Sequence, residues 1–280
     1  MFSDVLLTVD FDRTLTGPDS GIPARNLEAI RYFMDNGGHF TVNTGRSLPM
    51  AAENILGKVP VNAPLLLYNG SADYDAQTGK FTRSVPLPLS RDVLLNQMQQ
   101  RFPRLNFEEQ SFVAHHLARK DAGWEAYCEN NHCVWSYETP DVPFVKAAFY
   151  GQFRENTVAS MYEATAEELA LFDEAIAWLE ETYGDRLELF RACARIVDVH
   201  AKGVSKGVAA LELKSRLGKK ILVCAGDAEN DIAMMEAADY AFCPADGGIA
   251  DRYPNVCNCA DGAVAEVIYK KIPEILAISP

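Results

Sequence analysis

Two aspartates, Asp10 and Asp12, follow directly on a short run of apolar, largely β-branched residues over 5–9. Carboxylates at the end of a buried strand suit two kinds of chemistry, the binding of a hard divalent cation and general acid–base catalysis. The D-x-D pattern alone more often marks a turn in which aspartates accept hydrogen bonds from backbone amides. A calcium loop is excluded, because its sixth position must be glycine and its twelfth glutamate, where counting from Asp10 gives Leu15 and Gly21.

Further polar side chains follow later apolar runs or stand at the start of an amphipathic segment. They are Thr44 in TVNTGRS, Lys206 in GVSKG, and Asp227, Asn230 and Asp231 in GDAEND. Taken singly, they could be a turn hydroxyl, a solvated lysine and residues that cap a helix. In open parallel sheets ligands bind beyond the carboxyl ends of the strands, so the set indicates one site at that edge.

The sequence around these residues alternates between short apolar runs and amphipathic segments. In the N-terminal part the spacing predicts strands over 5–10, 39–45 and 64–70, and helices over 24–36 and 48–57. Near the C-terminus it predicts helices over 204–218 and about 230–238, and strands over 220–227 and 240–243. Such alternation is typical of parallel βαβ units, so we predict that both parts belong to one α/β domain with a parallel sheet.

The pattern changes between these two parts. A hairpin-like stretch over 71–85 is followed by helices near 91–102 and 165–183 and by strands near 112–117, 144–150, 187–193 and 195–200. The helix over 165–183 begins with a T-x-x-E capping box, from Thr165 to Glu168. We therefore predict two domains, a core of residues 1–83 and 195–280 and an inserted α+β domain of residues 84–194.

The segments DFDRTLT, TVNTGRS, GVSKG and GDAEND resemble, in order, the four motifs of the haloacid dehalogenase superfamily. The stretches NTGRS, LLLYNG, GVSKG and GDAENDIAM also resemble its Cof-like sugar-phosphatase branch, and the long insert looks like the α+β cap of that branch. The resemblance spans nearly the whole chain. It implies a Rossmann-like parallel-sheet core with an inserted α+β cap domain, and a magnesium-dependent phosphatase that hydrolyses a small phosphate monoester, with a sugar phosphate favoured.

The resemblance also implies roles for the acidic residues. Asp10 would be the nucleophile that takes up the phosphoryl group as an aspartyl phosphate. Asp12 would protonate the leaving oxygen and then deprotonate the water that hydrolyses the intermediate. Magnesium would be held by the carboxylates of Asp10 and Asp227 and by the backbone carbonyl of Asp12, which are hard oxygen ligands.

Two further residues are implied to hold the phosphoryl oxygens. Thr44 offers a hydroxyl donor, and Lys206 adds a positive charge near the start of its helix. Lys202 is a rival cation, but only Lys206 immediately precedes glycine in the S-K-G pattern of the family.

Four more residues match the motifs of the branch. Asn230 and Asp231 are implied to orient Asp227, metal-bound water or the motif lysine. Arg46 and Asn69 also stand beyond predicted strand ends, where either the substrate or a structural hydrogen-bond network is open as their role.

The chain departs from the family pattern at two places. Many relatives have D-x-D-G-T, whereas this chain has Arg13 before Thr14, so we expect a loop conformation that a residue with a side chain tolerates. After the strand near 243, relatives often have Asn-Ala where this chain reads CPADGG, which leaves that edge of the site undefined.

Composition restricts the partners and the location. The net charge of -13 disfavours nucleic acid, because binding to its phosphates needs clustered lysine and arginine. No stretch approaches the roughly 20 apolar residues of a membrane span, and the N-terminus lacks the pattern of a signal peptide. Seven cysteines without a CxxC pair are typical of reduced thiols, so we expect a cytoplasmic protein. His115 and His116 are predicted to point to opposite faces of a strand, which disfavours a metal shared by the two.

The expected partner is a small phosphorylated metabolite, while the oligomeric state is left open. A phosphomutase or phosphotransferase is an alternative, since it would use the same aspartyl phosphate and pass it to a sugar hydroxyl. A non-enzymatic phospho-acceptor signalling domain also gathers aspartates, threonine and lysine at parallel strand ends. It is disfavoured because it needs neither a cap-sized insert nor an acid–base residue such as Asp12.

Overall fold

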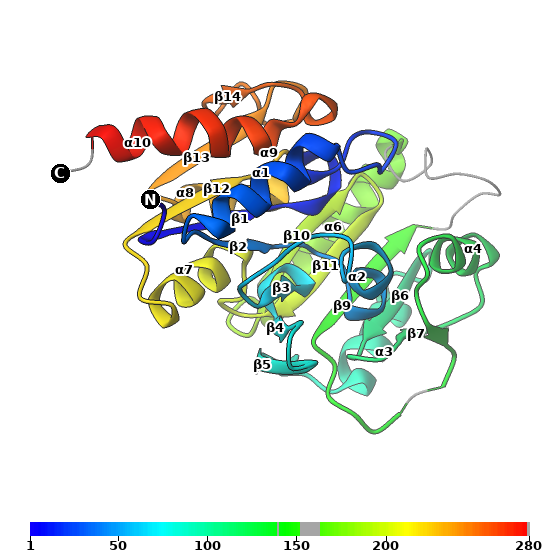
Figure 1. The fold of residues 1–280 in the computed structure, drawn as a ribbon. Helices are drawn as coiled ribbons and strands as arrows, with labels where there is room; N and C mark the ends of the chain where they lie inside the picture. Colours follow the sequence, from blue (N-terminus) through cyan, green and yellow to red (C-terminus); the bar gives the residue numbers. More distant parts are fainter. Residues whose placement is uncertain (139, 152–162, 279–280) are drawn as a thin grey trace. The chain divides into compact units, whose positions relative to one another are not determined.

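The computed structural model of the protein describes residues 1–138, 140–151 and 163–278 (Figure 1). The chain forms two compact units. We call the first the core unit, made of Met1–Gly45, Ile55–Arg83 and Ser205–Pro280. The second, the cap unit, is made of Arg46–Asn54 and Ser84–Val204.

The core unit contains a five-stranded parallel sheet in the order β14-β13-β12-β1-β2. The strands are β1 (Val5–Val9), β2 (His39–Val42), β12 (Ile221–Ala225), β13 (Tyr240–Pro244) and β14 (Asn255–Val256). Strand β1 is buried along its whole length, as expected for a central parallel strand covered by helices on both faces. The α/β prediction is confirmed.

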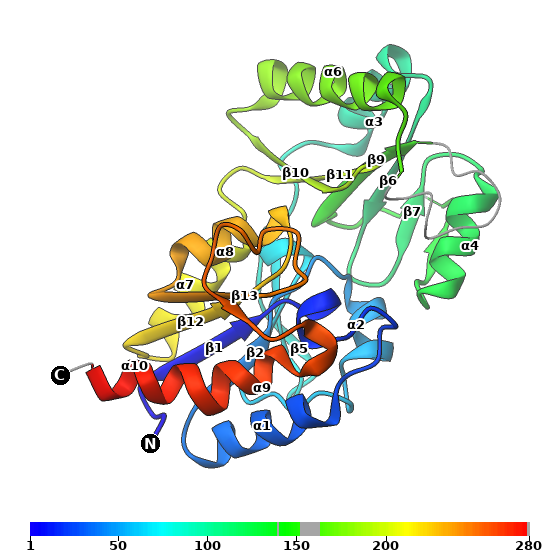
Figure 2. The same ribbon diagram turned by 90° about the horizontal axis from the view of Figure 1, so that it is seen from above.

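Helices cover both faces of this sheet. Figure 2 shows α7 (Lys206–Arg216) and α8 (Ile232–Ala237) on one face, and α1 (Ala24–Asp35), α9 (Ala263–Glu266) and α10 (Ile272–Ile278) on the other. Short turns of helix complete the unit: η1 (Phe11–Leu15), η2 (Tyr68–Gly70), η3 (Glu229–Asp231), η4 (Cys259–Asp261) and η5 (Val267–Lys271). A small sheet of β3 (Leu65–Leu67), β4 (Ala72–Asp75) and β5 (Lys80–Ser84) adjoins β2 through a parallel bridge between Asn43 and Leu66.

The register of the parallel strands brings three chain segments together. Val9 of β1 lies opposite Ala225 of β12 and opposite Val42 of β2. The residues after these strands therefore meet at one edge, where the amide of Asp10 donates to the carbonyl of Ala225 at 2.9 Å and that of Asn43 to the carbonyl of Val9 at 2.8 Å.

The cap unit is an α+β domain built on a six-stranded sheet in the order β10-β11-β9-β6-β7-β8. Its strands are β6 (Leu105–Gln110), β7 (His115–Leu117), β8 (Trp135–Ser136), β9 (Lys146–Gly151), β10 (Leu187–Cys193) and β11 (Ile196–Ala201). The helices among its described residues are α2 (Leu48–Asn54), α3 (Arg91–Arg101), α4 (Ala122–Asn130) and α6 (Ala166–Tyr183). The capping box of α6 is present as predicted.

The side chains of β9 alternate between two apolar clusters of the cap unit. Ala147 and Phe149 belong to the cluster that includes residues of α3 and α6, whereas Ala148 and Tyr150 pack with residues of α4. The cap sheet is therefore covered on both faces.

The units differ from the predicted domain boundaries at two places. The boundary before 195 would assign β11 to the core, but β11 pairs with β10 and β9 and belongs to the cap sheet. Residues 46–54, which contain α2, were assigned to the core but group with the cap unit. The strand predicted near 112–117 is shorter and is preceded by β6, whose polar composition gave no strand signal.

None of the helices in the described ranges combines the length and the apolar character needed to cross a membrane.

Candidate active site

A buried lysine joins two aspartates at the carboxyl edge of the core sheet. Lys206 is the first residue of α7, whose N-terminus is capped by Ser205 through the amide of Val208 at 3.1 Å. The Nζ atom of Lys206 donates to Oδ1 of Asp10 and to Oδ1 of Asp231, both at 2.6 Å. The lysine is 1% exposed, so these ion pairs lie in a site of low effective dielectric constant.

Asp231 connects this lysine to Asp227. While its Oδ1 accepts from Lys206, its Oδ2 accepts from the backbone amides of Asp227 and Ala228 at 3.0 and 3.1 Å. Both oxygens of Asp231 are thus engaged in fixing neighbours. Asp227 itself accepts a hydrogen bond at Oδ1 from the hydroxyl of Thr14 at 3.2 Å.

Burial, reinforced by neighbouring carboxylates, raises the pKa values of Asp10 and Asp227. Burial raises the pKa of Asp10 well above its ordinary value, with further increases from Asp231, Asp227 and Asp12, while Lys206 opposes the shift. Burial and the charge of Asp231 likewise raise the pKa of Asp227 to about 7. For Lys206, burial lowers the pKa, but the two aspartates outweigh it and raise the pKa above its ordinary value.

The excess of buried carboxylates over cations bears on whether these residues could hold a divalent cation. One ligand oxygen from each of Asp10, Asp227 and Asp231 lies within 4.8 Å of the others. Lys206 carries one positive charge, and Arg13, 3.9 Å from Asp227, is half exposed, so a further cation would favour the ionised forms of the three buried carboxylates. The donor set consists of hard oxygens, which suits Mg²⁺.

Two further residues predicted for the site, Thr44 and Asn69, lie in the core unit. Thr44 is buried, and its amide donates to the carbonyl of Leu66 at 2.9 Å. The amide of Asn69 in turn donates to the carbonyl of Thr44 at 3.0 Å, so the two predicted residues are adjacent. Arg46, the other residue predicted from the same motif, belongs to the cap unit.

Of the two rival lysines, the structure favours Lys206. Lys202 pairs with Glu188 of the cap unit at 3.2 Å and is half exposed. Asn230 is partly buried in η3, next to Asp231.

Arg13 does not follow the conformation that we expected for it. Its φ of 59° and ψ of 9° lie in the left-handed region, which favours glycine. Arg13 therefore carries its side chain at a position whose backbone conformation glycine adopts more readily. The Nε atom of Arg13 lies 3.9 Å from Oδ2 of Asp227. Its partly buried neighbour Asp12 is one of the charges acting on Asp10.

The CPADGG segment packs behind Asp227. The amide of Ile249 donates to the carbonyl of Asp227 at 3.3 Å, and a Cβ at Gly247 would contact the Cα of Asp227 at 3.2 Å. The carboxylate of Asp246 accepts from the amide of Cys259 at 2.9 Å and from its thiol at 3.1 Å. The edge left undefined by the sequence is thus a support for the Asp227 backbone.

Sequence reasoning missed two residues that organise the site. Thr14 bonds Asp227, and the side-chain amide of Asn43 donates to the carbonyl of Lys206 at 2.9 Å. Both lie inside segments already singled out, DFDRTLT and TVNTGRS, which was the available signal.

Sequence comparison places these residues in a known family. Residues 7–248 match the haloacid dehalogenase-like hydrolases. The HMP-PP phosphatase of Yersinia enterocolitica is 26% identical over 232 residues, covering 82% of this chain and 80% of that protein. A Streptococcus pyogenes protein named as a phosphatase is 26% identical over 240 residues, covering 82% of this chain and 83% of its own length.

A longer relative comes from Arabidopsis thaliana and is named chloroplastic endoribonuclease YBEY. It is 23% identical over 289 residues, which cover 93% of this chain. The chain spans only 45% of the length of that protein.

Solved structures share the fold at lower identity. A haloacid dehalogenase-like hydrolase from Bacteroides thetaiotaomicron has a TM-score of 0.74 at 18% identity, covering 95% of this chain and 98% of its own. A subclass IIB sugar phosphatase of the same superfamily has a TM-score of 0.72 at 15% identity, with coverages of 98% and 99%.

These comparisons confirm the predicted Cof-like branch, the core with an inserted α+β cap, and the expectation of an enzyme. The match covers the segments that contain Asp10, Thr44, Lys206 and Asp227. The chain belongs to the haloacid dehalogenase-like hydrolase family.

Proposed function

We propose that the protein is a magnesium-dependent phosphatase that hydrolyses a small phosphate monoester through an aspartyl phosphate on Asp10. The observation that supports this most strongly is the buried group in which Lys206 bonds both Asp10 and Asp231, while one carboxylate oxygen of Asp227 lies within 4.8 Å of an oxygen of each. Such an arrangement fixes a carboxylate nucleophile beside a site for positive charge, which phosphoryl transfer requires.

Asp10 is the residue that we assign to the attack. Lys206 holds its Oδ1, so the rotation of the carboxylate is restricted and Oδ2 is the oxygen assigned to bond formation with phosphorus. As the bond from phosphorus to the leaving oxygen breaks, that oxygen takes a proton from Asp12. Asp12 then removes a proton from water, which hydrolyses the aspartyl phosphate and releases inorganic phosphate.

The remaining residues bind and orient. Asp10, Asp227 and the backbone carbonyl of Asp12 would hold Mg²⁺, which when bound supplies charge neutralisation at the phosphoryl oxygens. Thr44 and Lys206 are assigned to the phosphoryl oxygens as hydroxyl donor and cation. Asp231 keeps Lys206 and the backbone at Asp227 in place, with Asn230 as its neighbour. Asn69 is assigned to orienting Thr44, and Arg46 to the substrate.

The substrate is proposed to be a small phosphorylated metabolite, with a sugar phosphate favoured, and the enzyme to act in the cytoplasm. One sequence relative is named for HMP-PP, and one structure of the same fold is named as a sugar phosphatase. Nucleic acid is not proposed as a partner, because the chain has a net charge of -13. A membrane is not proposed either, because no stretch of the sequence approaches the roughly 20 apolar residues of a membrane span.

A turnover assay tests this function. Purified protein with Mg²⁺ should release phosphate from an aryl phosphate and from members of a panel of sugar phosphates, nucleotides and phosphorylated cofactors. Excess chelator should abolish release, and Asp227→Asn should raise the Mg²⁺ concentration needed for half-maximal rate. Transfer of the phosphate to a second sugar in place of water would identify a phosphotransferase, and undiminished turnover in chelator would contradict the metal assignment.

A further inference from the structure

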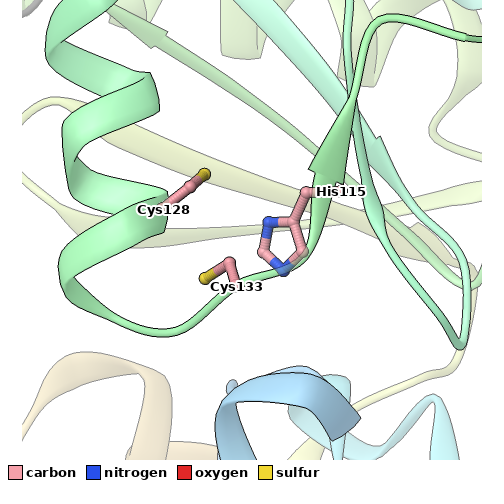
Figure 3. Close-up of side chains that lie close together, drawn as sticks. All are labelled: His115, Cys128 and Cys133. Carbon is pink, nitrogen blue, oxygen red and sulfur yellow. The ribbon is translucent and has the colours of Figure 1, made fainter.

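The cap unit contains a second group of metal-ligand side chains, which the proposed phosphatase chemistry does not use. His115 comes from β7, Cys128 from α4, and Cys133 from the segment after that helix (Figure 3). One ligand atom of each lies within 4.8 Å of the other two. All three side chains are buried, with exposures of 2%, 0% and 6%.

Backbone hydrogen bonds fix the positions of the three residues. Asp121 caps α4 by accepting from the amides of Gly123 and Trp124, which fixes the start of the helix that carries Cys128. The amide of Cys133 donates to the carbonyl of Cys128 at 2.8 Å, so the two thiols are held in one tight turn. The amide of His115 donates to the carbonyl of Val134 at 2.8 Å, which joins β7 to the same turn.

The imidazole of His115 is oriented from two sides. Its Nδ1 lies 3.2 Å from Oε2 of Glu108, and its Nε2 lies 2.9 Å from the hydroxyl of Ser47. Whichever nitrogen ligates a metal, the other keeps a partner, as in metal sites where a neighbouring group fixes the ring of a ligating histidine. Glu108 is itself held, because Trp124 donates to its Oε2 at 2.7 Å and Gln110 to its Oε1 at 2.6 Å.

From this geometry we propose that His115, Cys128 and Cys133 form a binding site for a thiophilic divalent ion, for which Zn²⁺ is the probe. Two thiols and one imidazole are soft and borderline ligands, which favour zinc over magnesium. On binding, each thiol gives up its proton and forms a bond to the metal, so two thiolates balance the charge of one Zn²⁺. Three protein ligands would leave a fourth position for water or a further oxygen ligand.

Burial favours metal binding over a redox pair. The surrounding cluster includes Met50, Leu117, Trp124 and Tyr150, and thiols used as redox sensors are generally accessible to the oxidant. A disulfide between Cys128 and Cys133 would also leave the oriented imidazole of His115 without a function. The disulfide is the alternative to metal binding, so the test must be able to detect it.

The test uses the full chain, reduced and stripped of metal, with millimolar Mg²⁺ present to occupy hard oxygen sites. After Zn²⁺ is added and excess ion removed, about one Zn²⁺ should remain per chain. Co²⁺ in its place should give a thiolate-to-cobalt charge-transfer band in the near ultraviolet. The variants Cys128→Ser and Cys133→Ser should lose the band and at least tenfold in zinc affinity, whereas the control Cys257→Ser in the core unit should keep both.

A second measurement works without any substitution. Bound Zn²⁺ should slow alkylation of Cys128 and Cys133 in the unmodified protein at least tenfold, as followed by peptide mass spectrometry, and leave alkylation of Cys257 unchanged. Zinc retention without this protection, a cobalt spectrum without the thiolate band, or a 128–133 disulfide with no zinc uptake after reduction would each overturn the proposal.

Discussion

At the scale of single residues, the site depends on how charge is balanced in a buried group. Lys206 is the cation shared by Asp10 and Asp231. Removing one partner of a buried ion pair leaves the other charge without compensation, which costs far more than losing a pair at the surface. Lys206 and Lys202, the two candidate lysines of the sequence, should therefore differ in how much stability is lost when each is removed.

Lys206→Met should lower the free energy of unfolding by about 3–5 kcal/mol, because two buried aspartates lose their cation. The matched control Lys202→Met removes a half-exposed pair with Glu188 and should cost less than about 1 kcal/mol. Urea denaturation of both variants at neutral pH measures the difference. Equal losses of stability in the two variants would contradict the description of Lys206 as a buried cation that compensates Asp10 and Asp231.

At the scale of elements, the parallel strands determine where the candidate site lies, and the loops after them determine the shape of that site. The register between β1, β2 and β12 places Asp10, Asn43 and Gly226 at one edge. In the loop that follows β1, Arg13 has a left-handed backbone conformation, which is less favourable for a residue with a side chain than for glycine.

Arg13→Gly should be more stable than Arg13→Ala by about 1 kcal/mol, because both variants lose the guanidinium but only glycine relieves the left-handed backbone. Thermal and urea unfolding of the two variants measure this difference. An alanine variant as stable as the glycine variant would mean that the loop leaves the left-handed conformation in solution.

In the cap sheet, burial raises the pKa of Glu109 to about 7, only partly opposed by Arg91. The unfolded carboxyl titrates at about 4.3, so the folded state binds the proton more tightly. The stabilisation that this group contributes is fully present below about pH 4.3, the pKa of the unfolded carboxyl. It is lost as the pH rises through 7, the pKa of the folded carboxyl. Between pH 5 and pH 8, Glu109→Gln should therefore gain roughly 1–3 kcal/mol relative to the parent protein.

Urea denaturation of the parent protein and the variant at both pH values gives this double difference. Glu167→Gln, at a side chain that is 75% exposed, is measured in parallel as the control for the substitution itself. A relative stability of Glu109→Gln that does not change with pH would contradict the raised pKa.

At the scale of the whole molecule, the sequence predicted the architecture of the two units better than it predicted the boundaries between them. The apolar runs of β1 and β12 and the order of the motifs were enough for an α/β core with an inserted α+β cap. The boundary at 195 failed because β11 reads as a buried strand in either unit, and only pairing with β9 and β10 assigns it.

The candidate site was predictable to a similar degree. Asp10, Lys206, Asp227 and Asp231 stand in motifs that resemble those of the family and lie at predicted strand ends or at a helix start, so the set of motifs indicated that they come together. The group of His115, Cys128 and Cys133 was invisible in the sequence, because its members come from a strand, a helix and a turn that only the folded cap unit brings together.

The central claim is that Asp10 carries the phosphoryl group and that Asp12 moves protons. Asp12→Asn should lose roughly 10²–10⁴-fold in turnover, since it cannot act as acid or base, but should still form the covalent intermediate with an activated aryl phosphate. Rapid acid quenching and peptide mass spectrometry of this variant should find one phosphoryl group on Asp10, and none when Asp10→Asn is added. Phosphate on a different residue, or turnover that survives in Asp10→Asn, would contradict the mechanism.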